Sequence, residues 1–295
     1  MEQKKILMIV NPRAGRSKPF EPLLCAASVL SVQGHLLSIR LTGGQGDAVA
    51  IACAEAEKFD LCIAVGGDGT LNEVTSGLLT LERPPLFGYF PQGSTNDFAA
   101  SLKIPNDPVA AAWALLRGEE RQLDVGFWNG RSFMYVASFG AFTRSSYAAS
   151  QSAKNALGHF AYILEGMKDL DSLRPYRIRL TADGEVLDGE YLFGAICNST
   201  SIGGLMKLDP ERVVLDDGKF EMLLIPSPKT PADLQKLVRA LLEQKYDREG
   251  LVFRHVSSIH LETEENLPWS LDGEYAPSQP VVDVENRQKA MRMLL

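Results

Sequence analysis

Short apolar runs alternate with segments of helical spacing over about the first 120 residues of the chain. Each run is followed by a turn that contains glycine or proline, and a helical segment then begins. We therefore expect strands at residues 6–10, 36–41, 60–65 and 85–91, and helices that end near residue 33 or span 47–58, 70–80 and 108–117. This order predicts a parallel sheet covered by helices on both faces. Ligands of such sheets bind beyond the carboxyl ends of the strands, where the polar turns lie.

The pattern changes near Leu123, after which strand-like segments dominate. Asn129-Gly130 and Asp183-Gly184 lie between apolar flanks and predict type I′ hairpin turns. The expected strands are 132–139, 176–181, 191–198, 220–225, 252–261 and 281–284, and the expected helices are 157–170 and 231–245, the second capped by Thr230. The sequence thus predicts an α/β domain over residues 1–122 and an antiparallel β-sandwich domain over residues 123–295. The C-terminal segment of the second domain is free to return to the first.

Composition and charge narrow the class of protein. A chain of 295 residues with 45% hydrophobic content can bury a large core, and its net charge of −7 disfavours nucleic acid as a partner. Its four cysteines have no C-x-x-C spacing and lie in apolar patterns, so we expect small core residues in a reducing compartment. We find no secretory leader and no apolar run of bilayer length, which predicts a soluble cytoplasmic protein that can still dock on a membrane surface.

The junction at residues 66–73 is the most informative segment. It reads Gly-Gly-Asp-Gly-Thr-Leu-Asn-Glu and directly follows the apolar run 61–65. Glycines let the backbone pass close to a polyphosphate, and the helix that starts here adds N–H groups and the positive end of its dipole. Asp68 would repel a phosphate at this position unless a divalent cation lies between them. The junction therefore predicts a magnesium–nucleotide site, and an ordinary glycine-rich turn is the alternative.

Two further strand ends carry polar turns. Residues 11–15 read Asn-Pro-Arg-Ala-Gly and bring a cation, Arg13 or Arg16, close to a helix start. Residues 92–97 read Gln-Gly-Ser-Thr-Asn-Asp and offer hydroxyls, an amide and a carboxylate. Taken singly, the first is explained by a plain turn and the second by an N-cap at Ser94 or Thr95. Because all three junctions fall on one edge of one sheet, together they favour a nucleotide site.

Other catalytic patterns do not occur in the sequence. The P-loop, the G-x-G-x-x-G fingerprint, the protein-kinase motifs and the G-x-S-x-G elbow are all missing. The four histidines have no metal-ligand spacing, so we interpret them as structural.

Three acidic segments of the second half are candidates for chemistry. Residues 271–274 read Leu-Asp-Gly-Glu and lie in a loop region constrained by prolines. The same four letters occur at 187–190, beside the predicted hairpin turn, where Asp-Gly is common turn chemistry, so we interpret that copy as structural. Residues 215–219 read Leu-Asp-Asp-Gly-Lys, which suits a cation site and a β-turn equally well.

In their order along the chain, these motifs resemble those of the diacylglycerol kinase-like lipid kinases. The resemblance rests on residues 11–15, 66–73, 93–98, 216–218 and 271–274, and stretches at 138–143 and 157–162 look like the soluble bacterial branch. It implies an α/β domain similar to that of NAD kinases and phosphofructokinases, followed by a β-sandwich. It also implies transfer of the γ-phosphoryl group of ATP to a lipid hydroxyl, with diacylglycerol giving phosphatidic acid as the first expectation.

The resemblance also assigns roles to individual residues. Glu274 becomes the proton acceptor with Asp272 beside it, and Asp68 organises the catalytic Mg²⁺. The implied ATP-binding residues are Asn11, Pro12, Arg13, Ala14, Gly15, Thr42, Gly66, Gly67, Asp68, Gly69, Thr70, Asn72, Glu73, Gly93, Ser94 and Asn96; a structural Mg²⁺ maps to the carboxylate of Asp217 and main-chain oxygens of Val214 and Lys219. The implied partners are a lipid at the membrane surface and a second copy in a homodimer, with closure of the two domains around the substrates.

Two departures from the family pattern leave the acceptor open. Ala99-Ala100 stand where the family commonly has an arginine, and the stretch at Gly203-Gly204 is one glycine short. The alternatives are another lipid, such as a sphingoid base or phosphatidylglycerol, or a soluble acceptor such as NAD. A non-catalytic nucleotide- or lipid-binding protein is disfavoured because every catalytic position is retained. A Rossmann dehydrogenase would need the missing dinucleotide fingerprint.

Overall fold

The computed structural model of the chain describes residues 2–15, 21–94, 96–140, 174–202, 206–208, 213–243, 246 and 250–295. The chain divides into two compact units, which are Met1–Asp124 with Lys289–Leu295, and Val125–Gln288. Within the described residues, no helix is both long and apolar enough to cross a lipid bilayer.

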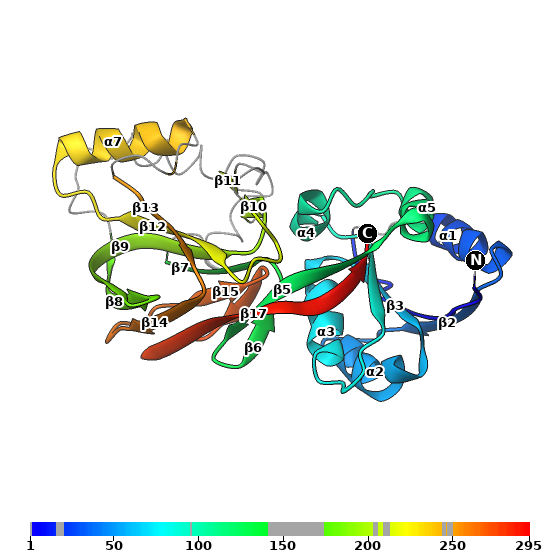
Figure 1. Ribbon diagram of the computed structural model, residues 1–295. Coiled ribbons are helices and arrows are strands. Elements are labelled where there is room, and N and C mark those ends of the chain that lie inside the picture. Colours follow the sequence, from blue (N-terminus) through cyan, green and yellow to red (C-terminus); the bar gives the residue numbers. More distant parts are fainter. Residues whose placement is uncertain are drawn as a thin grey trace. The chain divides into compact units, whose positions relative to one another are not determined.

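The first unit is a parallel sheet between two layers of helices (Figure 1). Its strands are β1 (Lys5–Val10), β2 (Leu36–Leu41), β3 (Leu61–Gly66) and β4 (Leu86–Pro91), in the spatial order β4-β3-β1-β2. Its helices are α1 (Glu21–Val32), α2 (Asp47–Glu55), the short 3₁₀ helix η1 (Ala56–Lys58), α3 (Asp68–Leu78), α4 (Asp97–Ser101) and α5 (Pro108–Arg117). Helix α1 packs with α5, and α2 packs with α3. Covering both faces explains why β1 and β3 are apolar at nearly every position.

The second unit is built from antiparallel strands. In spatial order they are β16 (Glu274–Ala276), β15 (Trp269–Leu271), β7 (Val136–Gly140), β9 (Glu185–Cys197), β8 (Tyr176–Ala182), β14 (Ser258–Glu262) and β17 (Val281–Leu294). The last strand, β17, belongs to this unit up to Gln288 and to the first unit from Lys289 on. Strand β12 (Phe220–Pro226) pairs with β9 and β13 (Val252–Val256), and β6 (Arg131–Phe133) pairs with β5 (Glu120–Trp128). The short pair β10 (Ser201–Ile202) and β11 (Met206–Lys207) stands apart, and α7 (Pro231–Leu242) is the described helix of this unit. A parallel α/β sheet followed by an antiparallel β domain is the predicted fold class.

Both predicted hairpin turns are confirmed. Asn129 and Gly130 have φ angles of 46° and 83°, and Asp183 and Gly184 have 44° and 89°. Positive φ at both central residues is the geometry of a type I′ turn.

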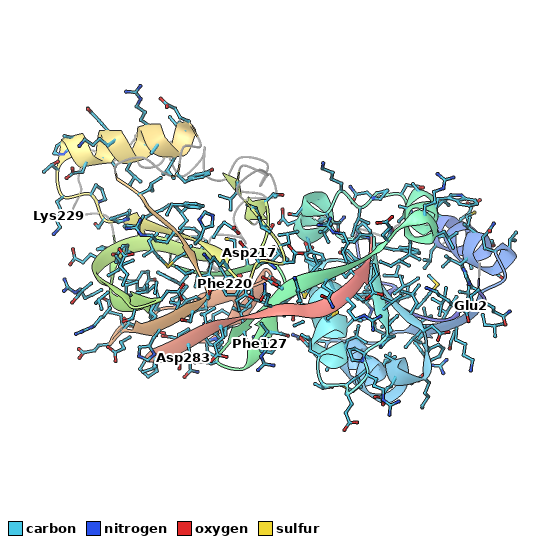
Figure 2. The ribbon with its side chains drawn as sticks, viewed as in Figure 1. Glu2, Phe127, Asp217, Phe220, Lys229 and Asp283 are labelled. Carbon is cyan, nitrogen blue, oxygen red and sulfur yellow. The ribbon has the colours of Figure 1, made fainter. Side chains whose placement is uncertain are left out.

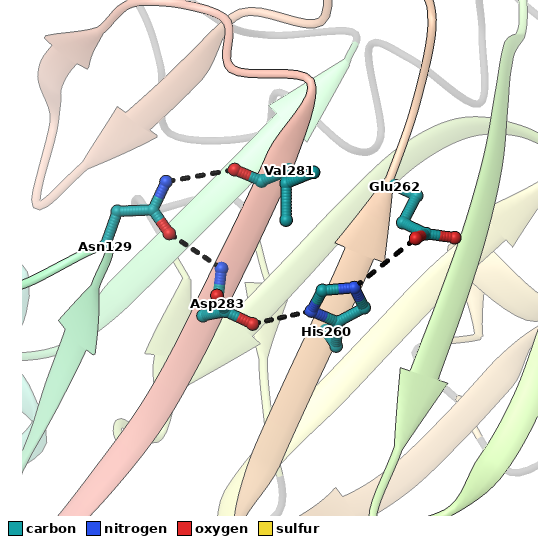
Figure 3. Close-up of polar contacts among 5 residues, drawn as sticks. All are labelled: Asn129, His260, Glu262, Val281 and Asp283. Atoms are coloured by element: carbon teal, nitrogen blue, oxygen red, sulfur yellow. Dashed lines mark hydrogen bonds and ion pairs between the residues drawn. The ribbon is translucent and has the colours of Figure 1, made fainter.

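The side chain of Asn129 ties the first of these turns to strand β17 (Figure 3). Asn129 donates from Nδ2 to the Val281 carbonyl at 3.0 Å and accepts the Asp283 N–H at 2.7 Å. Asp283 in turn contacts His260, with 2.6 Å between its Oδ1 and the ring Nδ1. Together these contacts fix the β5–β6 turn to β17.

Several boundaries predicted from the sequence are wrong. The segment 252–261 is two strands, because β13 pairs with β12 while β14 pairs with β8 and β17. The segment 132–139 is likewise divided between β6 and β7, and β9 and β17 are much longer than predicted. Cys62 and Cys197 are buried as expected, but Cys25 and Cys53 are exposed, so they are not core residues. The predicted helix 157–170 lies outside the described residues.

Candidate active site

The polar junctions of the first unit meet at the carboxyl ends of its strands. Asn11 follows β1, donates its backbone N–H to the Val65 carbonyl at 2.9 Å, and donates from Nδ2 to Thr70 Oγ1 at 3.1 Å. Its own Oδ1 accepts the Arg13 N–H at 2.9 Å, which closes the turn, and Gly15 has a φ angle of 65°. The predicted segments 11–15 and 66–73 are therefore joined by a direct hydrogen bond, from Asn11 to Thr70.

Glycines are required where β3 and β4 end. A Cβ atom on Gly66 would lie 2.6 Å from the Cβ of Thr70, and one on Gly93 would lie 2.6 Å from the Cα of Gly67. Gln92 also donates its N–H to the Gly66 carbonyl at 2.7 Å. Since real Cβ atoms do not approach other atoms so closely, these positions exclude larger residues. The close approach brings Gly93 against Gly67, the N-cap residue of α3.

The remaining predicted residues at this edge hold its loops in place. Glu73 accepts the N–H groups of Gly46 at 2.9 Å and Ala48 at 3.2 Å, so it ties the loop after β2 to α3. Thr42 is buried and donates its N–H to the Val10 carbonyl at 2.9 Å, beside Asn11. These contacts make Glu73 a positioning residue and place Thr42 at the same edge.

Asn96 shapes the turn after β4. Its backbone is left-handed, with φ of 54°, and its Oδ1 accepts the Gly93 N–H at 2.8 Å. Its Nδ2 donates to the Gly93 carbonyl at 3.2 Å and to Asn106 Oδ1 at 3.1 Å. Ser94 is exposed beside it. Arg16 and Thr95 lie outside the described residues.

Asp68 begins α3, where the helix dipole is positive. Its negative charge reaches Tyr89, whose phenol donates to the Gly66 carbonyl at 3.1 Å. Burial, with this charge as a second cause, raises the pKa of Tyr89 above its usual range, so the phenol stays protonated. Sequence reasoning missed Tyr89, which has no motif of its own and is recognised only by its position in β4.

In the second unit, the motif 271–274 forms a tight hairpin between β15 and β16. Asp272 and Gly273 have φ angles of 49° and 83°, another type I′ turn, and Leu271 pairs with Glu274. Trp269 anchors the hairpin in the core, since its ring centroid lies 4.8 Å from that of Phe139. The region predicted as a constrained loop is thus a regular hairpin.

Asp272 is a buried carboxylate that the backbone holds firmly. It is 2% exposed, and it accepts three backbone N–H groups: Met134 at 2.7 Å, Tyr135 at 3.0 Å and Val136 at 3.1 Å. Its own N–H donates to the Val136 carbonyl at 2.8 Å. These contacts are those of a positioning residue, which fixes the hairpin that carries Glu274.

Glu274 is exposed two residues further on, so its carboxylate is accessible to a bound molecule. The second copy of the motif has a different structure. Residues 187–190 lie within β9 and pair with β8, and Asp188 forms an ion pair of 2.6 Å with Arg177. The interpretation of this copy as structural is confirmed, because residues 187–190 belong to the ladder beside the turn at Asp183-Gly184.

The acidic turn 216–219 immediately precedes β12 (Figure 2). Gly218 has a φ angle of 81°, Asp217 accepts the Lys219 N–H at 2.9 Å, and Gln288 donates to the Asp216 carbonyl at 3.1 Å. No group of three or more His, Cys, Asp or Glu side chains suited to a metal occurs in the described ranges. The predicted Mg²⁺ site does not require such a group, because Mg²⁺ is often held by one or two carboxylates, carbonyl oxygens and several waters. An exposed Asp217 and the main-chain oxygens of Val214 and Lys219 fit that set.

The acidic turn and the hairpin 271–274 lie at the same end of the second unit's sheet. Glu221 pairs with Cys197, Cys197 pairs with Val136, and Val136 accepts the Asp272 N–H. Strands β9 and β7 therefore separate the turn before β12 from the hairpin after β15. Glu221 was missed by sequence reasoning, although a lone acid in the apolar run 220–225 was a visible signal.

Comparisons with known proteins agree with this arrangement. Residues 5–128 match the family model of the diacylglycerol kinase catalytic domain, and residues 136–295 match that of the YegS C-terminal NAD kinase beta sandwich-like domain. The diacylglycerol kinase of Bacillus subtilis strain 168 is 33% identical over 94% of this chain and 92% of its own length. That of Staphylococcus aureus strain MRSA252 is 31% identical over 94% and 88%.

Solved structures show the same likeness. A diacylglycerol kinase from Bacillus anthracis str. Sterne superposes with a TM-score of 0.73 at 25% identity, covering 100% of this chain and 98% of that chain. A second chain from this strain gives a TM-score of 0.83 at 27% identity, covering 100% and 98%.

The fold and the matched domains define a two-domain kinase with an α/β unit and a β-sandwich-like unit. The chain belongs to the diacylglycerol kinase family and is a lipid kinase.

Proposed function

We propose that the protein transfers the γ-phosphoryl group of ATP to the hydroxyl of diacylglycerol, giving phosphatidic acid. The observation that carries the proposal is the joining of three predicted ATP-binding segments at one sheet edge, through the Asn11–Thr70 hydrogen bond and the Gly67–Gly93 contact. A triphosphate at this edge faces the positive end of α3 and the glycine backbone. The names of the relatives support diacylglycerol as the acceptor.

In this mechanism the chain positions the reactants and moves one proton. The glycine turns of the first unit hold the phosphates in line with the acceptor, which can supply roughly 7–11 kcal/mol of the barrier. Glu274 accepts the proton of the attacking hydroxyl, and Asp272 keeps the hairpin in place. Asp68 would hold a Mg²⁺ ion, which would supply positive charge beside the transferred group. The acceptor lies at a membrane surface, and the enzyme reaches it from the cytoplasm.

The decisive assay measures radiolabelled phosphate transfer from ATP to dispersed lipids. We expect labelled phosphatidic acid from diacylglycerol and much less product from a sphingoid base, from phosphatidylglycerol or from NAD. Preferred labelling of NAD would overturn the assignment of a lipid acceptor. Preferred labelling of another lipid would replace diacylglycerol as the acceptor and leave the assignment as a lipid kinase unchanged. No turnover with any acceptor, together with tight ATP binding, would point to a non-catalytic protein.

The two copies of the Leu-Asp-Gly-Glu sequence supply a matched pair of variants. Glu274→Gln should lower kcat by about 10²–10⁴-fold, because it removes the proton acceptor, and should leave ATP binding intact. Asp188→Asn should have a small effect, since it only breaks an exposed ion pair within β9. Equal losses of activity from both changes would refute the role of Glu274.

A further inference from the structure

Glu221 is a buried acid that the proposed mechanism does not use. It is the charged residue of the otherwise apolar strand β12, and it is 2% exposed. Its neighbours Phe220 and Met222 point into the hydrophobic core of the second unit, so Glu221 faces the opposite side of the sheet. Across the ladder it pairs with Cys197 on β9 and His255 on β13. Neither neighbour supplies a permanent positive charge.

The carboxylate of Glu221 is incompletely compensated. Its Oε1 lies 3.8 Å from His255 Nε2, which is longer than a hydrogen bond. Its Oε2 is buried and has no hydrogen-bond partner among the described residues. Buried charges in proteins are normally paired or bound to metal, so this oxygen indicates a missing positive partner.

The acidic turn lies close to Glu221 along the chain. Only three residues separate Asp217 from Glu221, and the tight turn at Gly218 leads directly into β12. A divalent cation held between the Asp217 and Glu221 carboxylates would neutralise both charges.

We propose that Glu221 is a second carboxylate of the divalent-cation site at residues 214–219, in addition to Asp217. Two carboxylates match the charge of a divalent cation, and oxygen donors are the ligands that Mg²⁺ prefers. The inference rests on the cation site of the proposed function, but it does not depend on the identity of the lipid. It gives a reason for the presence of an acid inside an apolar strand.

Titration calorimetry of the full chain with MgCl₂, without nucleotide or lipid, tests the proposal. Against the wild type, Glu221→Gln should weaken Mg²⁺ binding at least about ten-fold, and Asp217→Asn should do so more strongly. Glu190→Gln removes an exposed acid of β9 and should leave the affinity unchanged. Mg²⁺ should also raise the unfolding temperature relative to a sample in EDTA, and the variants should rank in the same order by the size of this rise as by their Mg²⁺ affinity. Because no substrate is present, these readouts do not depend on whether the protein phosphorylates diacylglycerol.

The rival explanation is that Glu221 is held by protonated His255 and contacts no cation. In that case Glu221→Gln and His255→Ala would have equal effects on Mg²⁺ binding, whether both weaken it or neither changes it. Our proposal expects a difference: His255→Ala should bind Mg²⁺ like the wild type, and Glu221→Gln should bind it more weakly. Should Glu221→Gln fail to fold, Glu221→Asp keeps the charge but shortens its reach, and it should also lose about ten-fold. Wild-type affinity in either Glu221 variant, or no Mg²⁺ binding by the wild type, overturns the proposal.

Discussion

Replacing Asp272 tests whether its carboxylate takes part in the chemistry or only holds the hairpin 271–274 in position. The carboxylate accepts three backbone N–H groups in a site that is 2% exposed. A buried donor left without an acceptor costs about 1–3 kcal/mol, so losing the acceptor of all three donors in Asp272→Ala should destabilise the second unit by about 3–9 kcal/mol. Asp272→Asn keeps one acceptor oxygen and turns an amino group toward a donor, so it should cost about 1–3 kcal/mol. Domains are typically stable by only about 5–15 kcal/mol, so both losses are measurable.

Urea unfolding followed by tryptophan fluorescence is a suitable assay, because Trp128 and Trp269 of this unit have ring centroids only 5.9 Å apart. Activity is measured in parallel, with Glu274→Gln expected to lose activity at wild-type stability. The exposed Asp188→Asn serves as the control and should change stability by less than about 1 kcal/mol. If Asp272→Asn were inactive and as stable as the wild type, Asp272 would act directly on the substrate and the positioning role would be wrong.

Three further predictions concern the glycine turns, a surface histidine and a helix cap. Gly93→Ala forces a Cβ to within 2.6 Å of the Gly67 backbone and should weaken ATP binding at least about ten-fold, as measured by calorimetry. The control is Gly44→Ala, whose Cβ meets nothing within 4 Å. Equal ATP affinities of the two variants would contradict the close packing of Gly93 on Gly67. The Asp283 hydrogen bond raises the pKa of His260, so its stabilisation is complete below the unfolded pKa of about 6.5 and is lost as pH rises through the folded pKa. Because this side chain is 44% exposed, His260→Gln should cost no more than about 0.5 kcal/mol at pH 5 and nothing at pH 9 in urea titrations, and a pH-independent cost would refute the ion pair. Thr230→Ala removes the capping box of α7 and should cost about 1 kcal/mol in thermal unfolding, whereas Thr230→Ser should restore it.

The order of elements in the first unit was determined by the sequence. Residues 36–41 and 108–117 form the predicted strand and helix with the predicted ends, because apolar period, glycine turns and Asp107-Pro108 all favour the same boundaries. The hairpins at Asn129-Gly130 and Asp183-Gly184 were equally local, since a type I′ turn needs residues that tolerate positive φ. The candidate nucleotide edge followed from the same logic, because parallel strands place their carboxyl ends on one side.

Pairing between distant strands was decided only by the tertiary structure. The letters Leu-Asp-Gly-Glu form a hairpin turn at 271–274 and continuous strand at 187–190, because the turn at Asp183-Gly184 already sets the register of β9 against β8. Likewise, nothing local ends a strand at Ser257; β13 and β14 separate because they pair with different partners. Burial of Asp272 beneath three N–H groups and of Glu221 between β9 and β13 depends on residues far away in the sequence. Local propensity cannot encode such contacts, since they form only when the chain folds.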